Sequence, residues 1–124
     1  VFNHFDAERL ISSDSCSYIN IKLAKSGGIL EAIKIADTAA VHHIPCMLGG
    51  MVESRLALTA KVHLAMAHEN IRFYDLDTCL LGHLVDPVID GARYNNYFLE
   101  LDELPGIGAD ISPAFLSGAE KTII

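Results

Sequence analysis

A lysine at the end of a predicted strand is the first residue in this sequence that could do chemistry. Lys22 lies near the end of a segment, residues 18–23, in which apolar and polar side chains alternate strictly. Because side chains on a strand switch faces with a period of two, Lys22 shares the polar face with Tyr18 and Asn20. A glycine pair and a helical pattern follow at once. Enzymes of the α/β class keep catalytic groups at such strand ends, so Lys22 is a candidate catalytic residue.

Two carboxylates, Asp75 and Asp77, stand one residue apart at the end of another predicted strand. Side chains at positions i and i+2 of a strand face the same way, within roughly 7 Å of each other. Like charges this close repel unless a cation lies between them. The cation could be a metal ion or the ammonium group of a ligand. The alternative interpretation is a hydrated loop start.

Glu53 is the third candidate, because it follows a short predicted strand and the pair Gly49-Gly50. Taken alone, a glutamate in the first turn of a helix serves the helix dipole, and a lone lysine at a strand end is solvated. In a parallel sheet, however, all the carboxyl ends of the strands lie on one edge. Lys22, Glu53 and the two aspartates therefore converge, which favours an active site at this edge.

The elements that position these residues alternate along the chain. Periodicity predicts strands over residues 18–23, 45–48 and 71–76. Helical patterns cover residues 5–11, 29–42 and 54–67, with Asp6 and Ser54 as the expected N-caps of the first and last. Such α-β-α-β-α-β order predicts an α/β fold with a parallel sheet.

The pattern changes after residue 81, which divides the chain into segments 1–81 and 82–124. Residues 82–110 contain no long helical pattern, and Asp90-Gly91 and Pro105-Gly106 mark turns. Residues 97–101 read as a strand, so we expect a hairpin-like excursion away from the sheet. No element is assigned to the tail from Ile111 onward.

Composition narrows the class of protein. The 124 residues are 51% hydrophobic, which indicates a globular domain with a core, and the net charge of −7 argues against a nucleic-acid surface. No apolar run is long enough to span a membrane. The three cysteines and six histidines show no metal-binding spacing, and free thiols suit a cytoplasmic location. The first residue is Val1, so we expect a piece of a longer or processed chain.

The motifs together resemble a known family. They are the segment 21–28 around Lys22 with its Lys-x-x-Lys-x-Gly-Gly spacing, the segment 51–55 around Glu53, and Asp75-Leu76-Asp77 followed by Leu80-Leu81. They resemble the C-terminal part of the enolase superfamily, within its muconate-lactonizing subgroup. Among its members they are most similar to dipeptide epimerases of the L-Ala-D/L-Glu type, since the Asp-x-Asp pair distinguishes these from cycloisomerases and o-succinylbenzoate synthases.

The resemblance implies strands six to eight of a modified TIM (β/α)8 barrel, followed by a segment that returns to a capping domain. It implies that Lys22 is one of two acid/base lysines that flank the α-carbon of the substrate. Asp75 and Asp77 would bind the ammonium group of the dipeptide. Glu53 and Gly50 would line the substrate pocket.

The resemblance also implies a Mg²⁺ cofactor, whose ligands we expect upstream of this segment and none within it. Its expected partners are a dipeptide, the remainder of the barrel, the capping domain and a second copy in a homo-oligomer. Recycling of peptidoglycan peptides in the cytoplasm would be its setting. The alternatives are another muconate-lactonizing-type enzyme, such as a cycloisomerase, and a non-enzymatic α/β module.

Overall fold

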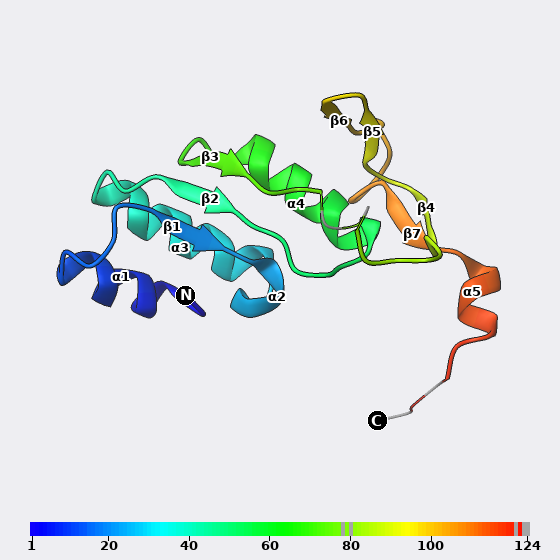
Figure 1. Ribbon diagram of the computed structural model, residues 1–124, viewed down its shortest axis with the longest axis horizontal. Coiled ribbons are helices and arrows are strands. Elements are labelled where there is room, and N and C mark those ends of the chain that lie inside the picture. Colours follow the sequence, from blue (N-terminus) through cyan, green and yellow to red (C-terminus); the bar gives the residue numbers. More distant parts are fainter. Residues whose placement is uncertain (78, 80, 121, 123–124) are drawn as a thin grey trace.

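The computed structural model of this protein describes residues 1–77, 79, 81–120 and 122. Its centre is a parallel sheet in the order β1-β2-β3, formed by Ile19–Ile21, Cys46–Leu48 and Ile71–Tyr74 (Figure 1). Strands β1 and β2 pair in register, while the pairing of β2 with β3 shifts just after Cys46. The parallel α/β sheet predicted from the sequence is therefore confirmed.

Helices cover one face of this sheet. Helix α3, Ile29–Val41, and helix α4, Arg55–Ala67, lie behind the strands in Figure 1, and α1, His4–Ser12, packs against α3. Strand side chains that point toward the helices form the main core with small residues of α3. The fully or nearly fully buried members are Ala7, Ile19, Ile21, Ala32, Ile35, Ala36, Ala39, Cys46, Leu48, Leu64 and Ile71. Among the described residues, no helix has the length and apolarity to cross a bilayer.

The opposite face of the sheet carries no covering layer of described residues. Tyr18 and Phe73 stack edge to face on it, with ring centroids 5.4 Å apart, yet they remain 59% and 45% exposed. Asn20 alternates with the buried residues of β1 and is exposed as well. Strands β1 and β3 are the two edges of the sheet, so the three strands do not close a barrel.

Two details of the first half differ from the sequence-based expectations. The first strand ends at Ile21 and not at residue 23, because a one-turn helix, α2 (Leu23–Ser26), begins there. The carbonyl of Lys22 accepts the amides of Lys25 and Ser26, at 2.9 and 3.0 Å, which starts this turn. The N-cap of α1 is Asn3 and not Asp6: the Asn3 side chain accepts the Asp6 amide at 2.9 Å.

The second half forms two small antiparallel pairs beyond the N-terminal end of α4, away from the main sheet (Figure 1). Strand β4, Val88–Asp90, pairs with β7, Ala109–Ile111, and β5, Arg93–Asn95, pairs with β6, Phe98–Glu100. A short helix, α5 (Pro113–Ser117), follows. The expected hairpin excursion is confirmed, α5 was not predicted, and Leu80 of the Leu80-Leu81 motif lies outside the described residues.

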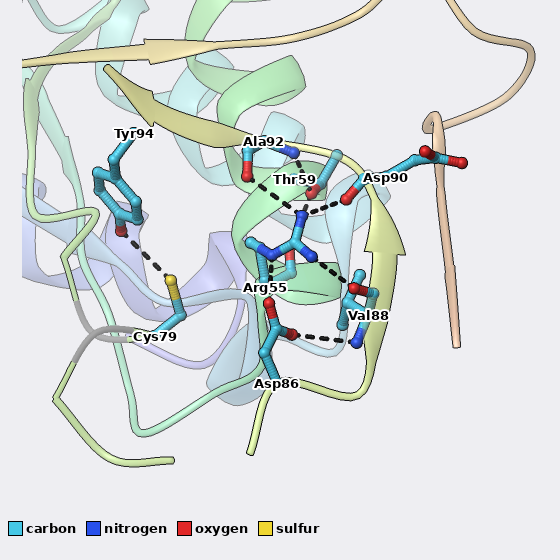
Figure 2. Close-up of polar contacts among 8 residues, drawn as sticks. All are labelled: Arg55, Thr59, Cys79, Asp86, Val88, Asp90, Ala92 and Tyr94. Carbon is cyan, nitrogen blue, oxygen red and sulfur yellow. Dashed lines mark hydrogen bonds and ion pairs between the residues drawn. The ribbon is translucent and has the colours of Figure 1, made fainter. Parts of the chain in front are cut away.

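One arginine ties this second half to α4. Figure 2 shows the guanidinium of Arg55, the first residue of α4, surrounded by acceptors from residues 86–92. Its Nε donates to Asp86 Oδ2 at 2.5 Å, and its Nη atoms donate to the backbone carbonyls of Val88, Asp90 and Ala92. The loop after β3 is therefore fixed to the same helix that follows β2.

Gly91 makes the closest approach in this region. Its φ is +81°, and a Cβ there would lie 2.6 Å from Thr59 Oγ1 and 2.8 Å from Ala109 Cβ. The Thr59 hydroxyl also accepts the Ala92 amide at 2.9 Å, so it has little freedom to move away. Left-handed backbone and steric overlap both oppose a side chain at this position.

We expect Gly91→Ala to lower the free energy of unfolding by about 2–4 kcal/mol, the sum of backbone strain and overpacking. Urea unfolding of the full-length polypeptide measures this change. Gly106→Ala is the matched control, because Gly106 also has a positive φ of +67°, but a Cβ added there would meet no atom within 4 Å. Equal losses in the two variants would show that contacts of Gly91 with α4 and β7 contribute nothing.

Candidate active site

Lys22 lies where β1 ends and α2 begins, as the N-cap residue of α2 with an extended backbone. Its place at the carboxyl end of a parallel strand agrees with the prediction, although it follows the strand by one residue. Its Nζ lies 3.9 Å from the Met51 sulfur, which belongs to the loop after β2. The ammonium group is thus next to the loop that joins β2 to α4.

That loop, residues 49–54, connects the ends of the three strands. The Gly49 amide donates to Ile21 O at 2.8 Å, and the Gly50 amide donates to Asp75 Oδ2 at 3.3 Å. A Cβ on Gly49 would lie 2.4 Å from Asn20 Oδ1, so the loop passes directly over the β1 side chain. Glycine at this position allows the loop backbone to lie close to both neighbouring strands.

Asp75 and Asp77 follow β3, which ends at Tyr74 rather than at the predicted residue 76. The Asp75 amide donates to Leu48 O at 2.9 Å, so the backbone stays beside β2 for one more residue. Both residues line one cavity of about 810 Å³. Asp75 is half-buried and Asp77 is exposed. The predicted pair therefore opens onto a common space at the sheet edge.

The hairpin β5–β6 supplies an aromatic wall of this cavity that the sequence reasoning did not include. Tyr94, Tyr97 and Phe98 line it together with the two aspartates. The clustering of aromatic residues around Asn95-Asn96 was the available indication. The cavity lining therefore combines the two aspartates with aromatic side chains from the hairpin.

Tyr94 also contacts the segment that carries the aspartates. Its hydroxyl donates to the carbonyl of Leu76 and lies 3.3 Å from Cys79 Sγ (Figure 2 shows the second contact). Burial, with a further contribution from the hydrogen bond to Cys79, raises the pKa of the Tyr94 hydroxyl above its usual value. This upward shift favours the protonated phenol, which donates to the Leu76 carbonyl between the two aspartates.

Glu53 is placed differently from the other candidates. Its Oε1 accepts the Met51 amide at 2.9 Å and the Nζ of Lys61 at 2.6 Å. Its side chain is 12% exposed, and that of Lys61 is fully buried. In the part of the chain that the structure describes, no hydrogen bond joins Glu53 to Lys22, Asp75 or Asp77. The structure thus brings Lys22, Gly50 and Asp75 to one edge, with Glu53 behind the loop.

A metal site was not expected in this segment. Among residues 1–77, 79, 81–120 and 122, no three His, Cys, Asp or Glu side chains gather closely enough to hold a metal ion. The described residues therefore do not form a Mg²⁺ centre by themselves.

Comparison with known proteins decides the family. A family model described as "Enolase C-terminal domain-like" matches residues 1–115. The chain belongs to this family. This enolase C-terminal domain-like chain is 43% identical over 98% of its length to the D-Ala-D/L-Ala epimerase of Cytophaga hutchinsonii. It is 44% identical over 89% of its length to the L-Ala-D/L-Glu epimerase of Clostridium acetobutylicum.

Solved structures agree with these relatives. The chain superposes with a TM-score of 0.90, at 42% identity over 97% of its length, on a Cytophaga hutchinsonii dipeptide epimerase complexed with Mg and D-Ala-L-Val. The chain spans about a third of the length of the curated relatives that it matches, 33% and 30% for the two epimerases above. These comparisons confirm the resemblance to dipeptide epimerases. They also confirm the predicted fold class, the C-terminal part of an enolase-superfamily barrel.

Proposed function

We propose that the polypeptide containing this chain epimerises a dipeptide at its α-carbon, with L-Ala-D/L-Glu as the substrate type. The observation that supports this most directly is the meeting of Lys22, the Gly50 amide and Asp75 at one sheet edge through a single loop. The similar proteins named as dipeptide epimerases support the same reaction. The rest of the enzyme, including its capping domain, would complete the pocket.

In this proposal Lys22 exchanges a proton with the α-carbon. An α-proton beside a carboxylate is weakly acidic, so the base must be positioned against it and the resulting enediolate must be stabilised. A neutral Lys22 Nζ takes the proton on one face, and an acid from the rest of the polypeptide returns a proton on the other. The exposed ammonium position beside the loop leaves Nζ free to approach a bound substrate.

Asp75 and Asp77 would bind the α-ammonium group of the dipeptide. They line one cavity, and their two negative charges call for a cation there. Gly50 would hold Asp75 in place through its amide, at 3.3 Å. A cycloisomerase substrate carries no ammonium group, so this pair favours the dipeptide over the alternative substrates.

Mg²⁺ is bound in the solved relative from Cytophaga hutchinsonii, and we propose it as the cofactor of the complete enzyme. Bound to a substrate carboxylate, such an ion acts as a Lewis acid. As the resemblance to the enolase superfamily implies, its ligands would belong to the rest of the polypeptide. Three further expectations stay predictions: a cytoplasmic location, peptidoglycan-derived peptides as substrates, and a homo-oligomer. The three free cysteines fit the cytoplasmic location.

The aspartate assignment gives a direct test of the function. Asp75→Asn or Asp77→Asn in the full-length enzyme should weaken dipeptide binding by about 1.5–3 kcal/mol, the range for hydrogen bonds to charged groups. The measurement is calorimetric titration with L-Ala-L-Glu and Mg²⁺, beside α-proton exchange in D₂O followed by NMR. Asp14→Asn, on the exposed turn after α1, is the matched control and should bind as the parent does.

An N-acetylated dipeptide completes this experiment. It lacks the ammonium charge, so the parent enzyme should bind it much more weakly than the free dipeptide. In the two variants, acetylation should cost little further affinity. A parent enzyme that exchanges no α-proton of any dipeptide would contradict the epimerase proposal. An equal penalty for acetylation in parent and variants would leave the reaction intact but remove the ammonium role of the aspartates.

A further inference from the structure

Lys61 is a buried charge outside the groups proposed for proton transfer and ammonium binding. It lies in α4 between Leu58 and Val62, with a side chain of 0% exposure. A buried ammonium group is costly unless it is paired and hydrogen-bonded. Its partner is Glu53, whose Oε1 lies 2.6 Å from Nζ and whose side chain is 12% exposed. The buried Lys61 ammonium group thus holds Glu53 by a charge-assisted hydrogen bond.

The Glu53 oxygen that Lys61 contacts also accepts the Met51 amide at 2.9 Å. The carboxylate therefore lies between the helix interior and the loop backbone. One residue before Met51, the Gly50 amide contacts Asp75, and the Met51 sulfur itself lies 3.9 Å from Lys22 Nζ. This contact chain runs from the core of α4 to both candidate groups at the sheet edge.

We infer that Lys61 is a positioning residue: through Glu53 it fixes the loop of residues 49–54 against Lys22 and Asp75. This inference rests on the proposed function for its catalytic consequence. It changes the expected role of Glu53 from a pocket-lining group to the connection between Lys61 and the loop. Displacements of about 1 Å at a reacting centre cost on the order of 10²-fold in rate, so loss of this connection would lower turnover.

The test uses Lys61→Met in the full-length enzyme, since Met is unbranched, similar in length and uncharged. We expect kcat to fall by about 10- to 100-fold with KM changed much less, because the aspartates keep their charge. Hydrogen exchange of the Met51 amide, measured without ligand, should accelerate at least about tenfold, because its acceptor is no longer held. Unchanged kcat together with unchanged exchange would overturn the inference.

The double variant Lys61→Met/Glu53→Gln separates positioning from folding. It removes both charges, so no unpaired carboxylate remains in the interior, and replacing a whole buried pair is often nearly neutral for stability. We expect its melting temperature to return toward that of the parent while kcat stays low and Met51 exchange stays fast. Recovery of all three to parental values would show that the pair serves only the fold, and would overturn the inference.

Lys34→Met is the matched control. Lys34 pairs with Glu31 at 3.4 Å on α3, with 60% of its side chain exposed. Parental kcat and parental Met51 exchange are expected there, and a loss as large as in Lys61→Met would overturn the inference. The exchange measurement needs no dipeptide turnover. A polypeptide that epimerises nothing but shows fast Met51 exchange in Lys61→Met would refute the proposed function and keep the positioning.

Discussion

Lys22→Met in the full-length enzyme should lower the rate of dipeptide epimerisation by about 10⁴-fold, the upper end of what a general acid or base contributes. Methionine keeps the length of the side chain but cannot accept or donate the α-proton. Among the described residues the Lys22 side chain makes one hydrogen bond, to the Met51 sulfur at 3.9 Å. The fold and the affinity for dipeptide should therefore change little.

Turnover is measured by α-proton exchange in D₂O and by the change of optical rotation, and affinity by titration with dipeptide and Mg²⁺. Lys25→Met is the matched control, because Lys25 is exposed in the same short helix α2 and lies three residues further on. It should keep parental turnover. Near-parental turnover in Lys22→Met would remove the lysine from the acid/base role.

The second large effect concerns the chain by itself. As an isolated polypeptide of 124 residues it should have no measurable epimerase activity and should fold poorly. The sheet has two open edges, β1 and β3, and the face with Tyr18 and Phe73 lacks a covering layer among the described residues. Unpaired edges and exposed apolar side chains favour association between chains.

Size-exclusion chromatography and thermal melting of the isolated chain test the first half of this prediction. Mixing it with the remainder of the polypeptide, followed by a Mg²⁺-dependent epimerase assay, tests the second, and activity should appear. A monodisperse monomer with a sharp melting transition that gains no activity on mixing would favour a self-standing α/β module.

The parallel sheet could be predicted from the order of apolar and polar residues. These residues alternate in one strand, apolar residues run together in another, and apolar residues recur at helical spacing in the helices between them. The strand ends were less predictable. Residue 22 continues the alternation of β1, but its carbonyl accepts the amides of α2, a turn whose start depends on backbone geometry rather than on side-chain pattern. Strand β3 likewise stops earlier than its pattern predicts, at Tyr74, although Asp75 still donates to β2.

The site was predictable in its strand-end groups and not in what supports them. Lys22, Asp75 and Gly50 follow from the rule that parallel strands end on one edge. Lys61 did not follow, because periodicity treats a lysine as a solvent-facing residue. Its position between Leu58 and Val62 on the buried side of α4 was the one indication. The aromatic wall depends on how the β5–β6 hairpin folds back, which is a tertiary contact that local pattern does not report.

The Arg55 contacts bear on how freely this region can vary in sequence. Apart from Asp86, the acceptors are main-chain carbonyls, which every residue type carries. The side chains of the segment that carries these carbonyls, residues 88–92, can therefore diverge among relatives without loss of this attachment. The condition is that Arg55 and the sharp turn at Gly91 remain. Aligned sequences would then show a variable loop with two fixed positions, and the variability would conceal a rigidly held segment.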